Sequence, residues 1–188
     1  MLRRSILNFC GLVLCQWPLA AANLPRLSPE YVIRLTTGKQ LLLSQFRGKV
    51  VALMFISTTC PHCQRTCQLV DRLHKEYGPQ RVQPFAVAFN ENAGMLVPDF
   101  IERFKIGYPV GYGTRESVAA YLDYPQSRTF VPISSFIDGK GMIRAQHFGD
   151  DEKFYADQEK NFRGLIEGLL RQSAKQPPAR LLRQSAAK

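Results

Sequence analysis

An unbroken run of seven apolar residues at positions 50–56 restricts the fold of this chain more than any other feature. The run lacks the alternation of polar and apolar side chains that a strand with one face in water would have. A strand that is apolar on both faces belongs in the middle of a sheet that helices cover on each side. The run therefore predicts a buried central strand and an α/β domain.

The segments after this strand alternate between helix and strand patterns, which favours parallel pairing. After Pro61 the apolar residues fall at helical spacing, and Gly78-Pro79 ends the predicted helix. Further strands are expected at 82–89, 109–112, 133–137 and 142–147, and further helices at 95–104, 115–122 and 162–170. Two short strands within residues 31–43 form an expected N-terminal β-hairpin extension, and Asp138-Gly139-Lys140-Gly141 predicts a second hairpin turn. The sum is a mixed central sheet flanked by helices.

The first 22 residues have the pattern of a secretory signal peptide. Arg3 and Arg4 precede a mostly apolar stretch, and Ala20-Ala21-Ala22 offers small residues for cleavage. The stretch is shorter than the ~18 residues that suggest a spanning helix, so an uncleaved anchor is the weaker alternative, and a lipid anchor at Cys15 is weaker still. We predict a signal peptide at 1–22, one domain at 23–172 and a periplasmic or secreted location, with membrane tethering as the alternative.

Residues 173–188 read as a basic tail without regular structure, although a basic docking segment is an alternative. The end of the chain supplies much of the formal charge of +10, through Arg171, Lys175, Arg180, Arg183 and Lys188 without an acid. A nucleic-acid-binding protein would need a basic stripe on the folded domain itself. No nucleic-acid partner is therefore expected.

Three cysteines remain once residues 1–22 are set aside, and Cys60, Cys63 and Cys67 crowd into one short segment. Secreted domains usually spread their cysteines to staple distant segments, whereas a local cluster points to redox or metal chemistry. No second C-x-x-C and no H-x-x-x-H motif supplies the remaining ligands of a zinc site. Redox chemistry is the better interpretation.

The order of strand, Cys60-Pro61-His62-Cys63 and helix assigns a role to each cysteine. A cysteine at a helix N-terminus meets unpaired N–H groups and the positive end of the dipole, which lower its pKa. Cys60 is therefore the predicted nucleophile, and Cys63, one turn further on, is the predicted resolving thiol. Pro61 suits the first helical turn because it has no N–H to lose.

The segment from Val50 to Cys63, followed by Val131-Pro132 and the stretch 136–141, resembles the TlpA-type branch of the thioredoxin superfamily across residues 31–170. The resemblance implies a thioredoxin fold and a thiol–disulfide oxidoreductase. It also implies a cis Pro132 beside the active-site disulfide and a Val131 backbone that pairs with a bound peptide. An ordinary trans proline at the start of a strand is the alternative for Pro132.

The expected partners are cysteine-containing protein substrates and a membrane thiol oxidoreductase that recycles the dithiol. No cofactor is expected beyond the redox-active disulfide of Cys60 and Cys63. His62 matches the Cys-Pro-His-Cys of DsbA-type oxidants, and its imidazole could add positive charge near Cys60. On this basis we expect a reduction potential less negative than about −220 mV, although the TlpA-like body favours a reductase.

Two positions depart from the family pattern. Thr59 stands where many relatives have tryptophan, and Thr66 stands where reductases of cytochrome c maturation have glutamate. Cys67 lies on the same helix face as both other cysteines, and we expect it to fill the core as a small apolar side chain.

Two other function classes stay open. A peroxiredoxin-like thiol peroxidase would use a T-x-x-C motif, which Ser57-Thr58-Thr59-Cys60 matches loosely. Arg128 could approach the thiolate of such an enzyme, but Leu53 stands where that motif needs proline. A Sco-like copper chaperone would use a C-x-x-x-C spacing such as Cys63 to Cys67, but positions 127–129 hold no histidine.

Overall fold

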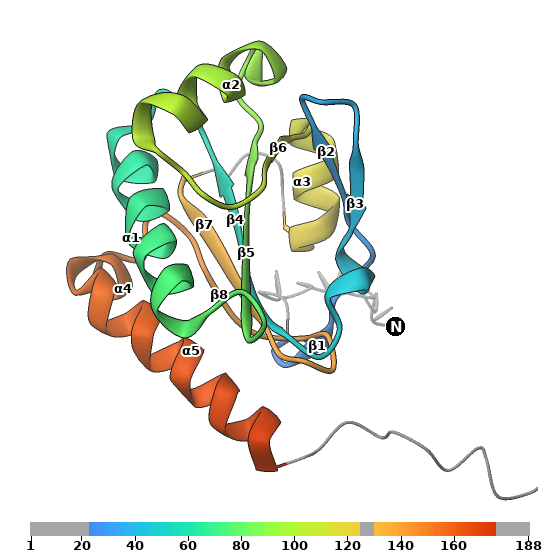
Figure 1. The fold of residues 1–188 in the computed structure, drawn as a ribbon, viewed down its shortest axis with the longest axis vertical. Helices are drawn as coiled ribbons and strands as arrows, with labels where there is room; N and C mark the ends of the chain where they lie inside the picture. The colour runs from blue at the N-terminus through green and yellow to red at the C-terminus, as the bar shows by residue number, and fades with distance from the viewer. Residues whose placement is uncertain (1–22, 125–129, 176–188) are drawn as a thin grey trace, which may run out of the picture.

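The computed structural model describes residues 23–124 and 130–175, and its strands form one eight-stranded mixed sheet in the order β1-β8-β7-β4-β5-β6-β2-β3 (Figure 1). The strands are β1 Arg26–Leu27, β2 Val32–Leu35, β3 Gln40–Leu42, β4 Val50–Ile56, β5 Val82–Ala88, β6 Val110–Tyr112, β7 Ile133–Ile137 and β8 Met142–His147. The helices are α1 Pro61–Tyr77, α2 Ala93–Phe104, α3 Arg115–Leu122, α4 Glu152–Ala156 and α5 Gln158–Lys175, with a 3₁₀ turn at Leu43–Phe46.

The apolar run forms β4, the central strand of the sheet, as predicted. All seven of its residues are buried. It pairs in parallel with β5, from Val50 opposite Val82 to Ile56 opposite Ala88, and antiparallel with β7 on its other side. The sheet is therefore mixed, and the carboxyl ends of β4 and β5 lie at the same edge.

Helices cover both faces of the sheet, so β4 contacts a core on each side. One core cluster joins apolar side chains of α1, α2, α4 and α5 to one face, and a second joins α3 and the segment around Tyr31 and Leu43 to the other. Figure 1 shows α1 and α5 on one side of the strands and α3 on the opposite side. The predicted helix-flanked mixed sheet is confirmed.

The predicted N-terminal hairpin is also confirmed, and it extends the sheet beyond β6. β2 pairs with β3 around a turn at Gly38, whose φ is 84°. β2 also pairs antiparallel with β6. At this junction a Cβ on Gly111 would lie 2.7 Å from the main-chain oxygen of Arg34, so only glycine allows this approach.

The structure differs from the sequence prediction at the ends of the domain. β1, which pairs with β8, and the short helix α4 were not predicted. α5 runs through Lys175, and the Ser173 hydroxyl donates to the Leu169 carbonyl oxygen at 3.0 Å, so the expectation of irregular chain from 173 is wrong for 173–175. The predicted signal peptide and residues 176–188 lie outside the described residues. Among the helices described here, none has the length and apolarity needed to span a membrane.

Candidate active site

Cys60 and Cys63 lie at the N-terminus of α1, directly beyond the carboxyl end of β4. Cys60 is the N-cap, with extended backbone angles, and Pro61 occupies the first turn. The Cys63 amide donates to the Cys60 sulfur at 3.3 Å, so that sulfur meets one of the unpaired N–H groups of the helix end. The predicted placement of both cysteines is confirmed.

The two thiols differ in exposure. Cys60 is partly exposed, whereas Cys63 is fully buried, and both are free thiols in this structure. Burial raises the pKa of the Cys63 thiol well above its usual range, and its hydrogen bond with Cys60 adds to the rise. An attacking thiol must be accessible and able to ionise, so the geometry favours Cys60 as the nucleophile.

The Val131-Pro132 segment lies beside Cys60. The peptide bond between the two residues is cis, as the family resemblance implied, and Pro132 is buried at the start of β7. The Val131 carbonyl oxygen lies 4.0 Å from the Cys60 sulfur. The structure therefore brings together the six candidate residues singled out from the sequence, namely Cys60, Pro61, His62, Cys63, Val131 and Pro132.

Asn90 supports the turn before Cys60 and was not identified from the sequence. The Thr58 amide donates to Asn90 Oδ1 at 3.0 Å, and Asn90 Nδ2 donates to the Thr58 hydroxyl at 3.1 Å. Gln64 Nε2 in α1 donates to the Thr58 carbonyl oxygen at 3.0 Å. These bonds tie the ends of β4 and β5 and the first turn of α1 to one another.

His62 packs its ring edge-on against Tyr155 of α4, with 5.0 Å between the ring centroids. Burial lowers the pKa of His62, the nearby charge of Arg65 lowers it further, and a hydrogen bond with Gln158 opposes both. A pKa below its usual value leaves the imidazole mostly neutral at pH 7. The positive charge that His62 could add beside Cys60 is therefore small at that pH.

Two residues after β8, neither of them predicted from the sequence, contact the segment around Val131 and Pro132. Tyr155 donates its hydroxyl to the Pro132 carbonyl oxygen at 2.8 Å. The Gly149 amide donates to the Phe130 carbonyl oxygen at 2.8 Å. A sequence signal existed for Tyr155, because Asp151 is a favoured N-cap residue and is followed by the residues of α4.

Cys67 fills the core, as expected from its spacing. It is fully buried, and burial raises the pKa of its thiol to about 12. Thr66, also fully buried, donates its hydroxyl to the His62 carbonyl oxygen at 3.0 Å. Thr66 therefore bonds to the main chain of the active-site turn.

Arg128 was considered for a peroxidase and positions 127–129 for a copper chaperone. All of these positions lie outside the described residues.

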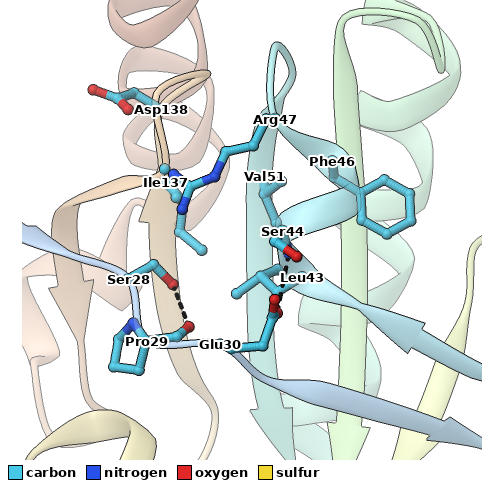
Figure 2. A pocket seen from close by; sticks show the side chains of 11 residues that line it. Ser28, Pro29, Glu30, Leu43, Ser44, Phe46, Arg47, Val51, Ile137 and Asp138 are labelled. Carbon is cyan, nitrogen blue, oxygen red and sulfur yellow. Dashed lines mark hydrogen bonds between the residues drawn. The ribbon is translucent and has the colours of Figure 1, made fainter.

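A pocket of about 90 Å³ lies at the opposite end of β4 from Cys60 (Figure 2). Glu30 and Ser44 both line it, and the Ser44 amide donates to the Glu30 carboxylate at 3.1 Å. Val51, at the start of β4, lines it as well.

The described residues contain no group of three or more histidine, cysteine or acidic side chains placed to hold a metal ion.

Known proteins resemble this chain in sequence and fold. The thiol-disulfide oxidoreductase ResA of Geobacillus kaustophilus is 31% identical over 118 residues, which are 62% of this chain and 64% of the relative. ResA of Bacillus subtilis is 30% identical over 105 residues, or 55% of this chain and 58% of the relative. The chain thus spans under two thirds of the length of these relatives.

Solved structures share the fold. A thiol:disulfide interchange protein of the thioredoxin family from Chlorobium tepidum superposes with a TM-score of 0.63 at 23% identity, covering 78% of this chain and 97% of the other. A secreted disulfide oxidoreductase of Mycobacterium tuberculosis superposes with a TM-score of 0.59 at 14% identity, covering 74% and 96%. The predicted thioredoxin fold is confirmed. The model of the AhpC/TSA family matches residues 25–146, a range that includes Cys60, Cys63 and Pro132, and this chain belongs to that family.

Proposed function

We propose that this protein is a thiol–disulfide oxidoreductase that exchanges disulfides with cysteine-containing proteins through Cys60 and Cys63. The observation that carries the proposal is the geometry at the start of α1. The partly exposed Cys60 sulfur accepts a hydrogen bond from the Cys63 amide at 3.3 Å and lies 4.0 Å from the Val131 carbonyl oxygen. The name and sequence similarity of the ResA relatives support the same activity.

In the reducing direction the Cys60 thiolate attacks one sulfur of a substrate disulfide. A bond forms between Cys60 and that sulfur, the substrate S–S bond breaks, and the other substrate sulfur leaves as a thiolate. Cys63 then loses its proton and attacks the Cys60 sulfur, which forms the Cys60–Cys63 disulfide and releases the second substrate thiol. The substrate disulfide is reduced and the dithiol is oxidised. The oxidising direction is the reverse, and neither needs a further cofactor.

The high pKa of Cys63 determines which of the two thiols reacts first. A buried thiol that holds its proton does not compete with Cys60 for the incoming disulfide. Cys63 becomes reactive once the mixed disulfide has formed, because the Cys60 sulfur is then an electrophile within its reach. The substrate thiolate released in the first step can accept the proton of Cys63. The mixed disulfide with substrate is therefore on Cys60.

We place the reaction outside the cytoplasm, in the periplasm or as a secreted protein. The basic and apolar pattern of residues 1–22 supports export. The recycling partner in this proposal is a membrane thiol oxidoreductase that exchanges electrons with the Cys60–Cys63 pair. It would supply or remove the two electrons of each exchange.

Trapping tests the assignment of the two thiols. Cys63→Ser should accumulate a mixed disulfide on Cys60 when the reduced protein meets a peptide disulfide, because no thiol remains to resolve it. Cys60→Ser should neither exchange nor trap. Cys67→Ala is the matched control and should exchange as the parent does. Mass spectrometry after acid quenching locates the adduct, and an adduct on Cys63 in Cys60→Ser would reverse the roles.

Parallel incubations separate the alternative functions. The reduced protein is mixed with a peptide disulfide, with hydrogen peroxide and with Cu(I), and thiol loss and retained metal are measured. The proposal expects rapid thiol loss with the peptide disulfide. Rapid turnover with peroxide alone would contradict it and indicate a peroxidase, and tight retention of copper without exchange would indicate a chaperone.

A further inference from the structure

We propose that Tyr155 is a positioning residue for disulfide exchange, which holds the Val131-Pro132 main chain in register with Cys60 for an incoming polypeptide. The inference rests on the proposed function and adds to it a residue outside the matched range 25–146. Tyr155 lies in α4, a helix of five residues between β8 and α5.

The hydroxyl of Tyr155 bonds to two groups that directly follow the cis peptide bond between Val131 and Pro132. It lies 2.8 Å from the Pro132 carbonyl oxygen and 3.1 Å from the Ser134 hydroxyl. A phenol has one proton, and a carbonyl oxygen can only accept. The Pro132 carbonyl oxygen at 2.8 Å is nearer than that of His147 at 3.4 Å, so Tyr155 donates to Pro132 and accepts from Ser134.

The ring of the same side chain contacts the other half of the site. Its centroid lies 5.0 Å from that of His62, with the rings at 75°. His62 lies between the two cysteines, so Tyr155 contacts the Cys60-to-Cys63 turn with its ring and the Pro132 segment with its hydroxyl. One rigid aromatic residue thereby spans the two segments between which a substrate cysteine must enter.

Contacts with β8 hold α4 in place, and they therefore fix the position of the Tyr155 main chain. The Asp151 carboxylate accepts from the Phe154 amide at 3.1 Å and pairs with His147 Nδ1 at 2.8 Å. The ring of Phe154 stacks on that of His147, with 3.6 Å between centroids. The cap and the stacked pair fasten α4 to the end of β8, and Tyr155 extends from it to β7.

Loss of this positioning should affect disulfide exchange with polypeptide substrates and not with small disulfides. A peptide that pairs with the Val131 backbone needs that carbonyl at its native position, whereas a small disulfide needs only access to the Cys60 sulfur. Loss of the Tyr155 hydroxyl frees the Pro132 carbonyl oxygen and lets the segment shift. Exchange with peptides should slow, and exchange with small disulfides should not.

The test compares Tyr155→Phe with Tyr121→Phe. Tyr121 is a matched control because it is also buried, in the opposite core cluster, and its hydroxyl lies 3.0 Å from that of Ser28. Second-order rate constants are measured for the reduced proteins with a dye-labelled peptide disulfide and with 2-hydroxyethyl disulfide. Urea unfolding verifies that each variant is folded.

We expect Tyr155→Phe to slow the peptide reaction by about fivefold to tenfold, the loss expected for one or two net hydrogen bonds. The small-disulfide reaction should change by less than about twofold, and Tyr121→Phe should leave both rates unchanged. Equal slowing with both disulfides, or the same peptide rate in both variants, would overturn the inference. A parent protein that does not exchange with either disulfide would instead overturn the proposed function.

Ser134→Ala is the second variant, in case Tyr155→Phe does not fold. It removes one hydrogen bond of the Tyr155 hydroxyl and leaves the bond to Pro132. The peptide rate should fall by about twofold to threefold, with the small-disulfide rate unchanged. An unchanged peptide rate in this folded variant would count against a positioning role.

Discussion

The amide of Gly149 donates a hydrogen bond of 2.8 Å to the carbonyl oxygen of Phe130, and the two chain segments approach so closely that a side chain does not fit between them. A Cβ on Gly149 would lie 2.6 Å from the Val131 carbonyl oxygen. This contact is with the main chain of the segment beside Cys60, which cannot move aside as a flexible side chain could. Gly149 is therefore a steric requirement of the site.

We predict that Gly149→Ala displaces the Val131 carbonyl, lowers the free energy of unfolding by about 1–3 kcal/mol and slows peptide exchange. Gly164→Ala in α5 is the control, since a Cβ there meets nothing within 4 Å. That helical change should stabilise the protein by about 0.5–1 kcal/mol and leave exchange unchanged. Urea unfolding and exchange rates check both, and a Gly149→Ala protein with parental values would refute the prediction.

Cys67→Ala should preserve exchange and cost only about 1 kcal/mol of stability, because one buried sulfur is lost from a packed core. The raised pKa of about 12 keeps this thiol protonated at physiological pH, so it does not take part as a thiolate. Chemical denaturation and the peptide exchange rate measure the two effects. Abolished exchange in a folded Cys67→Ala protein would show that Cys67 is a third redox group.

Asp138 should make stability depend on pH. Burial raises the pKa of its carboxyl, but hydrogen bonds from the Met142 amide and Arg144 outweigh burial, so the pKa lies below its usual value. A lowered pKa contributes stability above the unfolded value of about 3.9, and that contribution is lost as the pH falls through the folded value. Asp138→Asn should therefore cost about 1–2 kcal/mol at pH 7 and progressively less below pH ~4.

Urea midpoints of the parent and Asp138→Asn between pH ~3 and pH ~7 test this prediction. Subtracting the two curves removes the contribution of the other carboxylates. A difference that stays constant across the range would show that the charge of Asp138 contributes nothing.

His62→Ala should shift the reduction potential by less than about 15 mV at pH 7.5, under about 1 kcal/mol for a two-electron couple. The reason is that burial lowers the pKa of His62, so no charge is lost at that pH. Below the His62 pKa the protonated ring favours the Cys60 thiolate and hence the reduced state. The parent should then become more oxidising than the variant, and equilibration with glutathione at two pH values measures this. A large difference at pH 7.5 would contradict the neutral state.

The parts of this protein that could be predicted are those whose residues lie close together in sequence. The unbroken apolar run determined β4, and the hairpin turn at Asp138 to Gly141 determined the pairing of β7 with β8, because each pattern is complete within a few residues. The active-site turn was equally local. Cys60 at the N-cap and Pro61 in the first turn follow from adjacent residues.

The missed features depend on contacts between distant segments. β1 has two residues and α4 five, which is too short for either to show a periodic pattern. Tyr155 reaches Pro132 across 23 positions, and the neutral state of His62 depends on burial that the chain alone does not display. Sequence patterns identified the chemistry of the site, whereas the groups that hold it in place came from tertiary packing.

The outermost strands of the sheet are also among its shortest. β1 contributes two residues and β3 three, whereas the central strands β4 and β5 have seven each. Another chain adding to either edge would find only a few backbone groups to pair with, too few for a stable new strand. The tapering of the sheet from its centre to its edges thus protects concentrated protein from edge-to-edge aggregation.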